Sequence, residues 1–438
     1  MRPDGGVPGT SSQSGGPILE PSEVIRLQYL KPSNILLKAL GLWLQYEVPK
    51  KKIRRIAAYA HRTIAIVVSI VAALHLAYWI VGNMDAFQDY STHTQYLRSL
   101  LLCILYLQAA VCVPTLVYWQ IGVSFQGFYE HLKAGTTGLS VLQYPKGMKR
   151  ATLSIFCCFL LVSAGLIACF YLNSFHPHLL QHRTDTTNAD TILAESMTAK
   201  LFPASIFNNN QSGSSAFVWT FGIASLVVEA YACVCWGLVH TLFASYWLLI
   251  FGEFHILNMD LKTDTNLRQV SVVKHYCHVH WRLRRLLAHL NRMCAHLTLV
   301  LTVTAPASLY LIISAVLTHH STLEQLDVDA GVNDKFNWLD IGFFCFFAAV
   351  FLLQLFGILF IGTCVRISAK RIEKRFQDVT VLERAVDNDM YLVAANYLAQ
   401  LSNEDPGLSI GGIFVLSKTS AIIATLALIF FGILHWKR

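Results

Sequence analysis

FVWTFGIASLVVEAYACVCWGLVHTLFASYWLLIF, residues 217–251, is the stretch of this 438-residue chain that decides its fold. Among Asp, Glu, Lys and Arg, only Glu229 occurs in these 35 residues. A helix needs about 20 apolar residues to cross the ~30 Å hydrocarbon core of a bilayer. The stretch is therefore too long for one crossing, and we expect it to continue beyond the membrane as a helix.

Other apolar segments long enough to cross a bilayer occur along the rest of the chain. Only 14% of all residues are charged, against about 25% in a typical soluble domain. We therefore predict an all-α membrane protein with seven transmembrane helices in contact with membrane lipid. Besides 217–251, the predicted spans are residues 57–81, 97–119, 151–172, 293–317, 338–365 and 414–434.

The loops between these spans predict the orientation of the chain. Lys and Arg number 27 on the side that includes the N-terminal segment and five on the other side. Because cytoplasmic loops carry the excess of basic residues, we expect a cytoplasmic N-terminus and, with seven spans, an extracellular C-terminus. The sequon Asn210-Gln211-Ser212 then falls in an outer loop, and we expect a glycan on Asn210.

This orientation divides the chain into alternating membrane and cytoplasmic segments. Residues 252–292 and 366–413 carry apolar residues at helical spacing among basic ones, and both are predicted as cytoplasmic helical segments. Gly411-Gly412 permits a sharp turn back to the membrane. The remaining segments are a cytoplasmic segment disordered at its start (1–56), spans one to four with a long outer loop 173–216 (57–251), spans five and six (293–365) and the last span (414–438).

The sequence does not indicate an enzyme. It contains no nucleophile elbow, P-loop or zinc-protease motif, so we predict no catalytic residue and no cofactor. His275, His278, His280 and His289 lie on different faces of one helix among arginines, and we predict no metal site there. The net charge of +8 comes from loops beside apolar spans, and we expect no nucleic-acid partner.

Glu229 is the most informative residue within a span. A carboxylate inside a membrane faces a helix bundle or water, either as a functional contact or as a structural hydrogen-bond partner. Glu229 lies in the outer half of its span, and aromatic residues crowd the outer halves of several spans. There they either line a pocket or form an interfacial belt. The predicted stimulus-binding residues are Tyr78, Trp79, Tyr106, Trp219, Glu229, Tyr310, Trp338 and Phe343.

Two stretches resemble the invertebrate gustatory receptor family of seven-span proteins. They are HVHWRLRRLLAHLNRMCAHLTLVLT at 278–302 and GLSIGGIFVLSKTSAIIATLALIFF at 407–431. The resemblance implies a stimulus-gated cation channel in the plasma membrane of sensory neurons, assembled as a homo- or hetero-tetramer of related subunits. It also implies that the last span lines the pore. This span is mostly apolar, and a pore of this kind can be closed by the loss of water at an apolar ring. The predicted pore-lining residues are Thr419, Ile422, Thr425 and Ile429.

The end of the chain departs from the usual pattern of insect members, which is Thr-Tyr followed by apolar residues and Gln-Phe. Here residues 430–436 read FFGILHW. This favours a divergent branch that resembles the nematode gustatory-like proteins that respond to light or peroxide. The expected stimulus is therefore a small chemical, high-energy light or peroxide.

Two other classes of membrane protein remain as alternatives. A G-protein-coupled receptor also has seven spans, but its C-terminus is cytoplasmic, and neither Asp-Arg-Tyr after the third span nor Asn-Pro-x-x-Tyr in the last span occurs here. A transporter typically shows an internal repeat or paired broken helices. We see neither feature clearly in the sequence.

Overall fold

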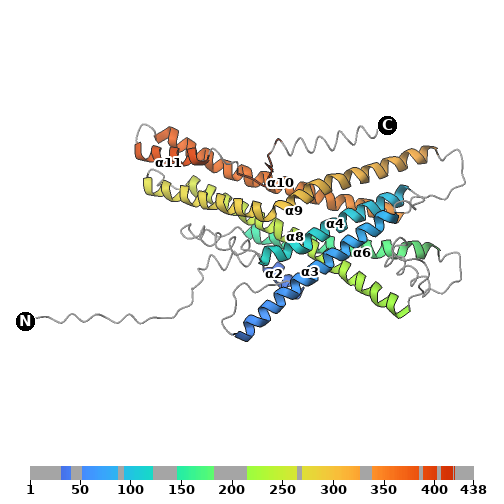
Figure 1. The fold of residues 1–438 in the computed structure, drawn as a ribbon. Helices are drawn as coiled ribbons and strands as arrows, with labels where there is room; N and C mark the ends of the chain where they lie inside the picture. Colours follow the sequence, from blue (N-terminus) through green and yellow to red (C-terminus); the bar gives the residue numbers. More distant parts are fainter. Residues whose placement is uncertain are drawn as a thin grey trace, which may run out of the picture.

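The computed structural model describes residues 31–40, 52–86, 93–121, 146–181, 215–263, 269–325, 338–383, 388–401, 406–417 and 419. Almost all of these residues are helical, and the exception is a short two-stranded sheet (Figure 1). The helices are α2 (Lys31–Ala39), α3 (Lys52–Ala86), α4 (His93–Ile121), α6 (Lys146–Gln181), α8 (Ser215–Thr263), α9 (Val270–Gln325), α10 (Trp338–Glu383) and α11 (Asn388–Leu401). The strands are β1 (Ser409–Ile410) and β2 (Phe414–Val415).

Six of the described helices are long and apolar enough to cross a membrane, namely α3, α4, α6, α8, α9 and α10. Each of the first six predicted spans lies in one of them. The predicted start of the seventh span is wrong, because Phe414 and Val415 belong to β2 rather than to a helix. From Lys418 onward the span lies outside the described residues, apart from Thr419.

The turn between β1 and β2 explains this difference. Gly411 and Gly412 both have positive φ, 59° and 75°, and the Ile413 N–H donates to Ile410 O at 2.9 Å. The two glycines are therefore the central residues of a β-turn that needs left-handed φ at both positions. The turn places Ser409 opposite Val415 and Ile410 opposite Phe414 in antiparallel register. The glycine pair therefore reverses the chain, as predicted, and also pairs the residues on either side of it.

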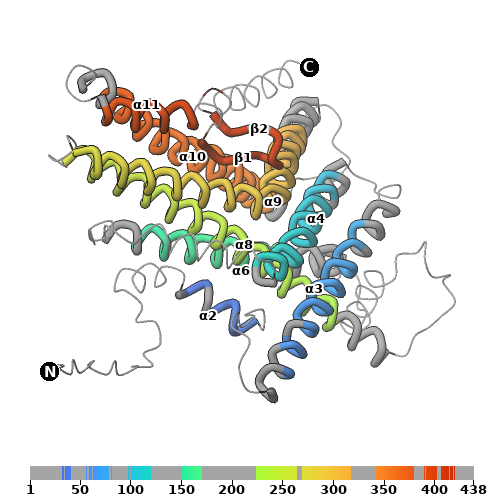
Figure 2. The backbone as a smooth tube through the Cα atoms, turned by 60° about the vertical axis from the view of Figure 1, so that its left-hand side comes forward, coloured from blue at the N-terminus to red at the C-terminus, as the bar shows by residue number. Residues whose placement is uncertain are grey.

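Three helices are much longer than a bilayer is thick. α8, α9 and α10 contain 49, 56 and 46 residues, which corresponds to about 70–85 Å at ~1.5 Å per residue. Figures 1 and 2 show their extended parts side by side with α11 at one end of the molecule, while α3 and α4 pack together at the other end. The molecule thus has two helix bundles that share the long helices α8, α9 and α10. One bundle contains α3 and α4. The other, which we call the projecting bundle, contains α11 and the extended parts of the three long helices.

α8 is the central helix of the fold. It packs against α3, α4, α6, α9 and α10, and nearly all side chains from Ala232 to Ile250 are buried. A helix that is apolar on all sides is typical of such a position. α3, in contrast, exposes Ile64, Val67 and Leu74, a face suited to contact with lipid.

Candidate functional site

Glu229 lies at the centre of a buried polar cluster formed by three helices. Its side chain is 3% exposed, and Ser225, one turn earlier on α8, has its hydroxyl 3.5 Å from Glu229 Oε1. His75 of α3 places Nε2 3.0 Å from the same hydroxyl, and Tyr106 of α4 hydrogen-bonds Glu229. We call these four residues the Glu229 cluster. Because a buried carboxylate is costly unless it is hydrogen-bonded, the cluster ties α3, α4 and α8 together at one point.

The other predicted stimulus-binding residues are distributed differently. Phe343 of α10 is buried, and the guanidinium carbon of Arg98 lies 4.9 Å from its ring centroid, a cation–π contact. Tyr310 of α9 is 44% exposed and therefore does not point into the buried interior of the subunit. The structure brings Tyr106 and Glu229 into contact, but it does not bring Tyr310 to them.

Several predicted residues cannot be placed by their side chains. Tyr78 and Trp79 fall within α3, Trp219 within α8, and Trp338 begins α10, but the description of these positions stops at the backbone. Thr419 is described and exposed. Asn210, Ile422, Thr425 and Ile429 lie outside the described residues. For these residues the roles stated above stay predictions.

A second buried polar cluster was not predicted from the sequence. Gln108 of α4 donates to Thr304 Oγ1 of α9 at 2.7 Å and accepts from the indole N–H of Trp236 on α8 at 3.0 Å. Gln354 of α10 donates to Gln108 Oε1 at 2.9 Å and lies 3.1 Å from His240 Nε2. We call these five residues the Gln108 cluster. Its signal in the sequence was a single glutamine within each of two apolar spans, since polar side chains there are rare and face other helices.

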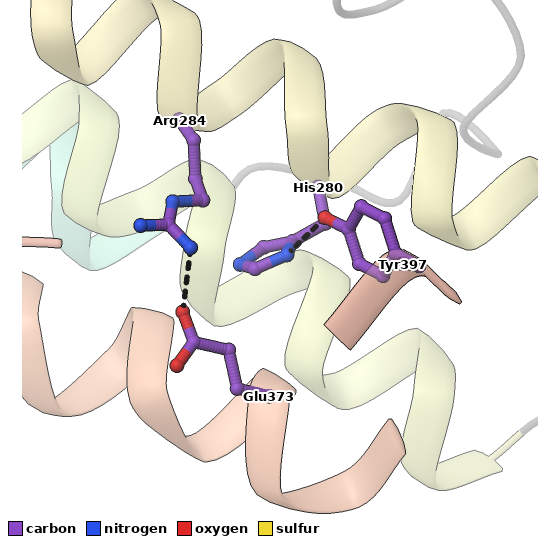
Figure 3. Close-up of polar contacts among 4 residues, drawn as sticks. All are labelled: His280, Arg284, Glu373 and Tyr397. Carbon is purple, nitrogen blue, oxygen red and sulfur yellow. Dashed lines mark hydrogen bonds and ion pairs between the residues drawn. The ribbon is translucent and has the colours of Figure 1, made fainter. Parts of the chain in front are cut away.

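The projecting bundle has its own polar contacts, drawn in Figure 3. His280 of α9 places Nδ1 2.6 Å from the Tyr397 hydroxyl of α11. Burial raises the pKa of Tyr397 above its ordinary value, so the hydroxyl keeps its proton and can donate it to a neutral imidazole. One turn later on α9, Arg284 forms a 3.0 Å ion pair with Glu373 of α10. Arg284 is 6% exposed, so it fixes helices to each other rather than facing solvent.

Comparison with solved structures identifies the fold. No protein-family model and no curated protein sequence matches this chain. The insect olfactory receptor OR5 from Machilis hrabei, solved in complex with eugenol, superposes with a TM-score of 0.57 and 12% identity, over 95% of this chain and 99% of OR5. A second structure of OR5 gives a TM-score of 0.55 and 13% identity, over 94% and 98%. The chain therefore has the fold of an insect olfactory receptor over 95% of its length, and its six long apolar helices make it a multi-pass membrane protein.

Proposed function

We propose that this chain is the subunit of a stimulus-gated cation channel of the chemosensory receptor type, in the plasma membrane of a sensory neuron. The observation that carries the proposal is the structural match to OR5 along nearly all of both chains. The sequence resemblance to gustatory receptors points to the same kind of protein. Four copies, identical or related, would surround a pore lined by the last span, with each N-terminus in the cytoplasm and each C-terminus outside.

The Glu229 cluster is the proposed polar contact for the stimulus. It gathers groups from three different helices, so a bound molecule that replaces one of these hydrogen bonds changes how the helices pack. Eugenol in OR5 is a small aromatic molecule with oxygen substituents. We propose a small polar-aromatic chemical as the stimulus, with peroxide or high-energy light as the alternative.

A substitution at Glu229 tests this site. Glu229→Gln keeps the shape and a hydrogen-bonding group but removes the charge, and hydrogen bonds to charged groups contribute about 1.5–3 kcal/mol. The stimulus concentration for half-maximal current should therefore rise by about tenfold or more. Thr63→Val, on the exposed face of α3, is the control and should leave it unchanged. Equal dose–response curves for Glu229→Gln and wild type would remove Glu229 from the stimulus site.

Light requires a different test, because indole rings absorb in the near ultraviolet. Trp79→Phe and Trp338→Phe should each reduce a response to light while leaving a response to a chemical intact. A light response that survives both substitutions would exclude these two tryptophans as the antenna.

The channel proposal itself is tested by whole-cell recording from a non-sensory cell that expresses the chain. The stimulus panel contains eugenol, hydrogen peroxide and ultraviolet or blue light, and surface labelling confirms delivery to the plasma membrane. We expect a cation current evoked by at least one stimulus. A chain that reaches the surface and stays silent to the whole panel would contradict the proposal.

Pore substitutions connect the current to this chain. Ile422→Ser places a hydroxyl in the predicted apolar constriction, which should ease wetting and raise the current without stimulus. Ile64→Ser is the matched control, because Ile64 is 60% exposed on α3. If both substitutions, or neither, raised the current, the assignment of the last span to the pore would fail.

A further inference from the structure

The hairpin formed by residues 406–417 is the last described element before the predicted pore-lining residues. Its strands pair through β1 and β2, and the Leu416 N–H donates to Leu408 O at 2.8 Å. Only one residue separates Ser417 from Thr419, the first predicted pore-lining residue. Any displacement of the hairpin therefore reaches the start of the last span directly.

Asn291 of α9 holds this hairpin by two hydrogen bonds from one side chain. Its Nδ2 donates to Gly407 O at 2.8 Å, and its Oδ1 accepts from the Ser409 N–H at 2.8 Å. An amide that pairs with a backbone carbonyl and the next-but-one N–H copies the pairing of a neighbouring β-strand. The hairpin thus docks on a helix through contacts that normally hold a sheet together.

Thr298 provides a second attachment two helical turns further along α9. Its Oγ1 lies 3.2 Å from Ser409 O and accepts from the Gly411 N–H at 3.3 Å. Residues seven apart lie on the same face of a helix, so Asn291 and Thr298 present one face to the hairpin. Two points of attachment fix its orientation as well as its distance from α9.

Apolar packing also holds the hairpin against α10. A Cβ at Gly362 of α10 would lie 3.0 Å from Leu408 Cβ and 3.2 Å from Leu416 Cδ1, so the glycine allows the hairpin to approach closely. Leu408 and Leu416 are both buried. The polar contacts to Asn291 and Thr298 are partly buried beside this apolar packing, and hydrogen bonds shielded from water are costly to lose.

The same helix connects this attachment to the rest of the membrane bundle. Thr304, six residues after Thr298 on α9, accepts the hydrogen bond from Gln108 of α4. α4 also carries Tyr106 of the Glu229 cluster. A continuous helix thus runs from the Gln108 cluster to the two residues that hold the hairpin.

We propose that Asn291 and Thr298 are positioning residues that transmit movement of α9 to the last span. The proposal rests on the channel function given above and adds the element that connects stimulus binding to the pore. Neither residue contacts the stimulus or the ions. Their removal uncouples the last span, so the stimulus still binds but opens the pore less often.

The test compares graded substitutions with matched controls. Asn291→Asp keeps the acceptor for Ser409 and loses the donor to Gly407, Asn291→Leu loses both, and Thr298→Val removes only the hydroxyl. Thr302→Val is the control for Thr298, because the Thr302 hydroxyl donates to the Thr298 carbonyl within α9 itself. Asn396→Leu, at an exposed asparagine of α11, is the control for Asn291.

The measurement is the maximal current at saturating stimulus, divided by the amount of protein at the cell surface. Loss of two hydrogen bonds shifts a two-state equilibrium by about tenfold or more, so we expect a fall of that order for Asn291→Leu. Asn291→Asp and Thr298→Val should give smaller falls. Half-maximal stimulus concentration, single-channel conductance and ion selectivity should stay close to wild type, because the stimulus site and pore residues are unchanged.

Three outcomes would overturn the inference. The first is a maximal current for Asn291→Leu equal to that of Asn396→Leu. The second is an altered ion selectivity of Asn291→Leu or Thr298→Val, which would place the substituted residue in the pore. A raised current without stimulus would mean that these bonds hold the pore shut rather than transmit opening. A silent wild type contradicts the channel proposal instead, so the two failures are distinguishable.

Discussion

Gln108 is fully buried and joins α4 to three other helices through the Gln108 cluster. Its amide is bonded on both sides, since Nε2 donates to Thr304 and Oε1 accepts from Trp236 and Gln354. In a membrane the helices lack a hydrophobic driving force between them, and polar contacts of this kind specify which faces meet. The cluster therefore fixes the rotation of four helices relative to one another.

Replacement of Gln108 should destabilise the bundle measurably. Gln108→Leu leaves the Trp236 and Gln354 donors without their acceptor, at a cost of about 1–3 kcal/mol. We expect a lower midpoint of thermal unfolding for the detergent-solubilised chain, measured by fluorescence-detected size exclusion. Leu107→Ala, at the neighbouring and 45% exposed position on α4, should change the midpoint little.

A double substitution distinguishes this explanation from a simple packing defect. If Gln108 and Gln354 act through one network, Gln108→Leu with Gln354→Leu should cost clearly less than the sum of the two single changes. Strictly additive losses would mean that the two residues stabilise the bundle independently, and the cluster described here would not be an energetic unit.

At the scale of elements, the glycine turn of the β1–β2 hairpin requires a backbone conformation with positive φ. Gly412 has φ of 75° and no atom within 4 Å of where a Cβ would lie, so a substitution there acts on the backbone alone. Alanine disfavours left-handed φ by roughly 1–2 kcal/mol, whereas asparagine adopts it more readily. We therefore expect Gly412→Ala to weaken the hairpin and Gly412→Asn to preserve it.

Hydrogen exchange of the segment 408–416 measures this difference. The amide of Leu416, which donates to Leu408 O, should exchange faster in Gly412→Ala than in wild type or Gly412→Asn. Identical exchange in all three proteins would show that the turn contributes nothing to the stability of the hairpin.

The ion pair between α9 and α10 belongs to the same scale. Glu373→Gln removes the charge that Arg284 meets at 3.0 Å, and Arg284 is nearly buried. Since hydrogen bonds to charged groups contribute about 1.5–3 kcal/mol, we expect a loss of that order at most, given that the Glu373 side chain is 20% exposed. Glu373→Asp should lose less in the same thermal unfolding assay, and equal losses for both substitutions would contradict a contribution from the charge.

The sequence predicted the long helices because their apolar length is unambiguous. It also predicted a reversal at Gly411-Gly412, but two strands of two residues each leave no periodic pattern that could be recognised. The sequence predicted less well which side of each helix faces the interior of the subunit. Tyr106 and Glu229, both predicted to bind the stimulus, are in contact. Tyr310, predicted with them, is exposed, because the packing of α9 against its neighbours decides which face of the helix is buried.

Sequence patterns did not predict the contacts between elements that are far apart in the sequence. Asn291 lies within the stretch 278–302 that resembles gustatory receptors, but its two bonds to the hairpin join residues 116 and 118 positions apart. Arg284 is one of the basic residues among the apolar ones of 252–292, yet it is buried against Glu373. In both cases the partner comes from a helix or hairpin whose position only the folded chain defines.

At the scale of the whole molecule, the orientation in the membrane is the first claim to test. If the N-terminus is cytoplasmic, three spans carry the chain across and place residues 173–216 outside, with the sequon at Asn210. Endoglycosidase treatment should then increase the gel mobility of wild type and leave Asn210→Gln unchanged. A C-terminal tag that is labelled in intact, unpermeabilised cells should agree, and a tag accessible only after permeabilisation would contradict seven spans.

The central claim is that the chain is itself the conducting element, and reconstitution tests it most directly. Purified protein in a planar lipid bilayer has no G protein, second messenger or other channel beside it. We predict discrete unitary cation currents that the stimulus active in cells evokes and that the Ile422→Ser substitution alters. Protein that is correctly folded and inserted, binds that stimulus and yet passes no current would contradict the claim.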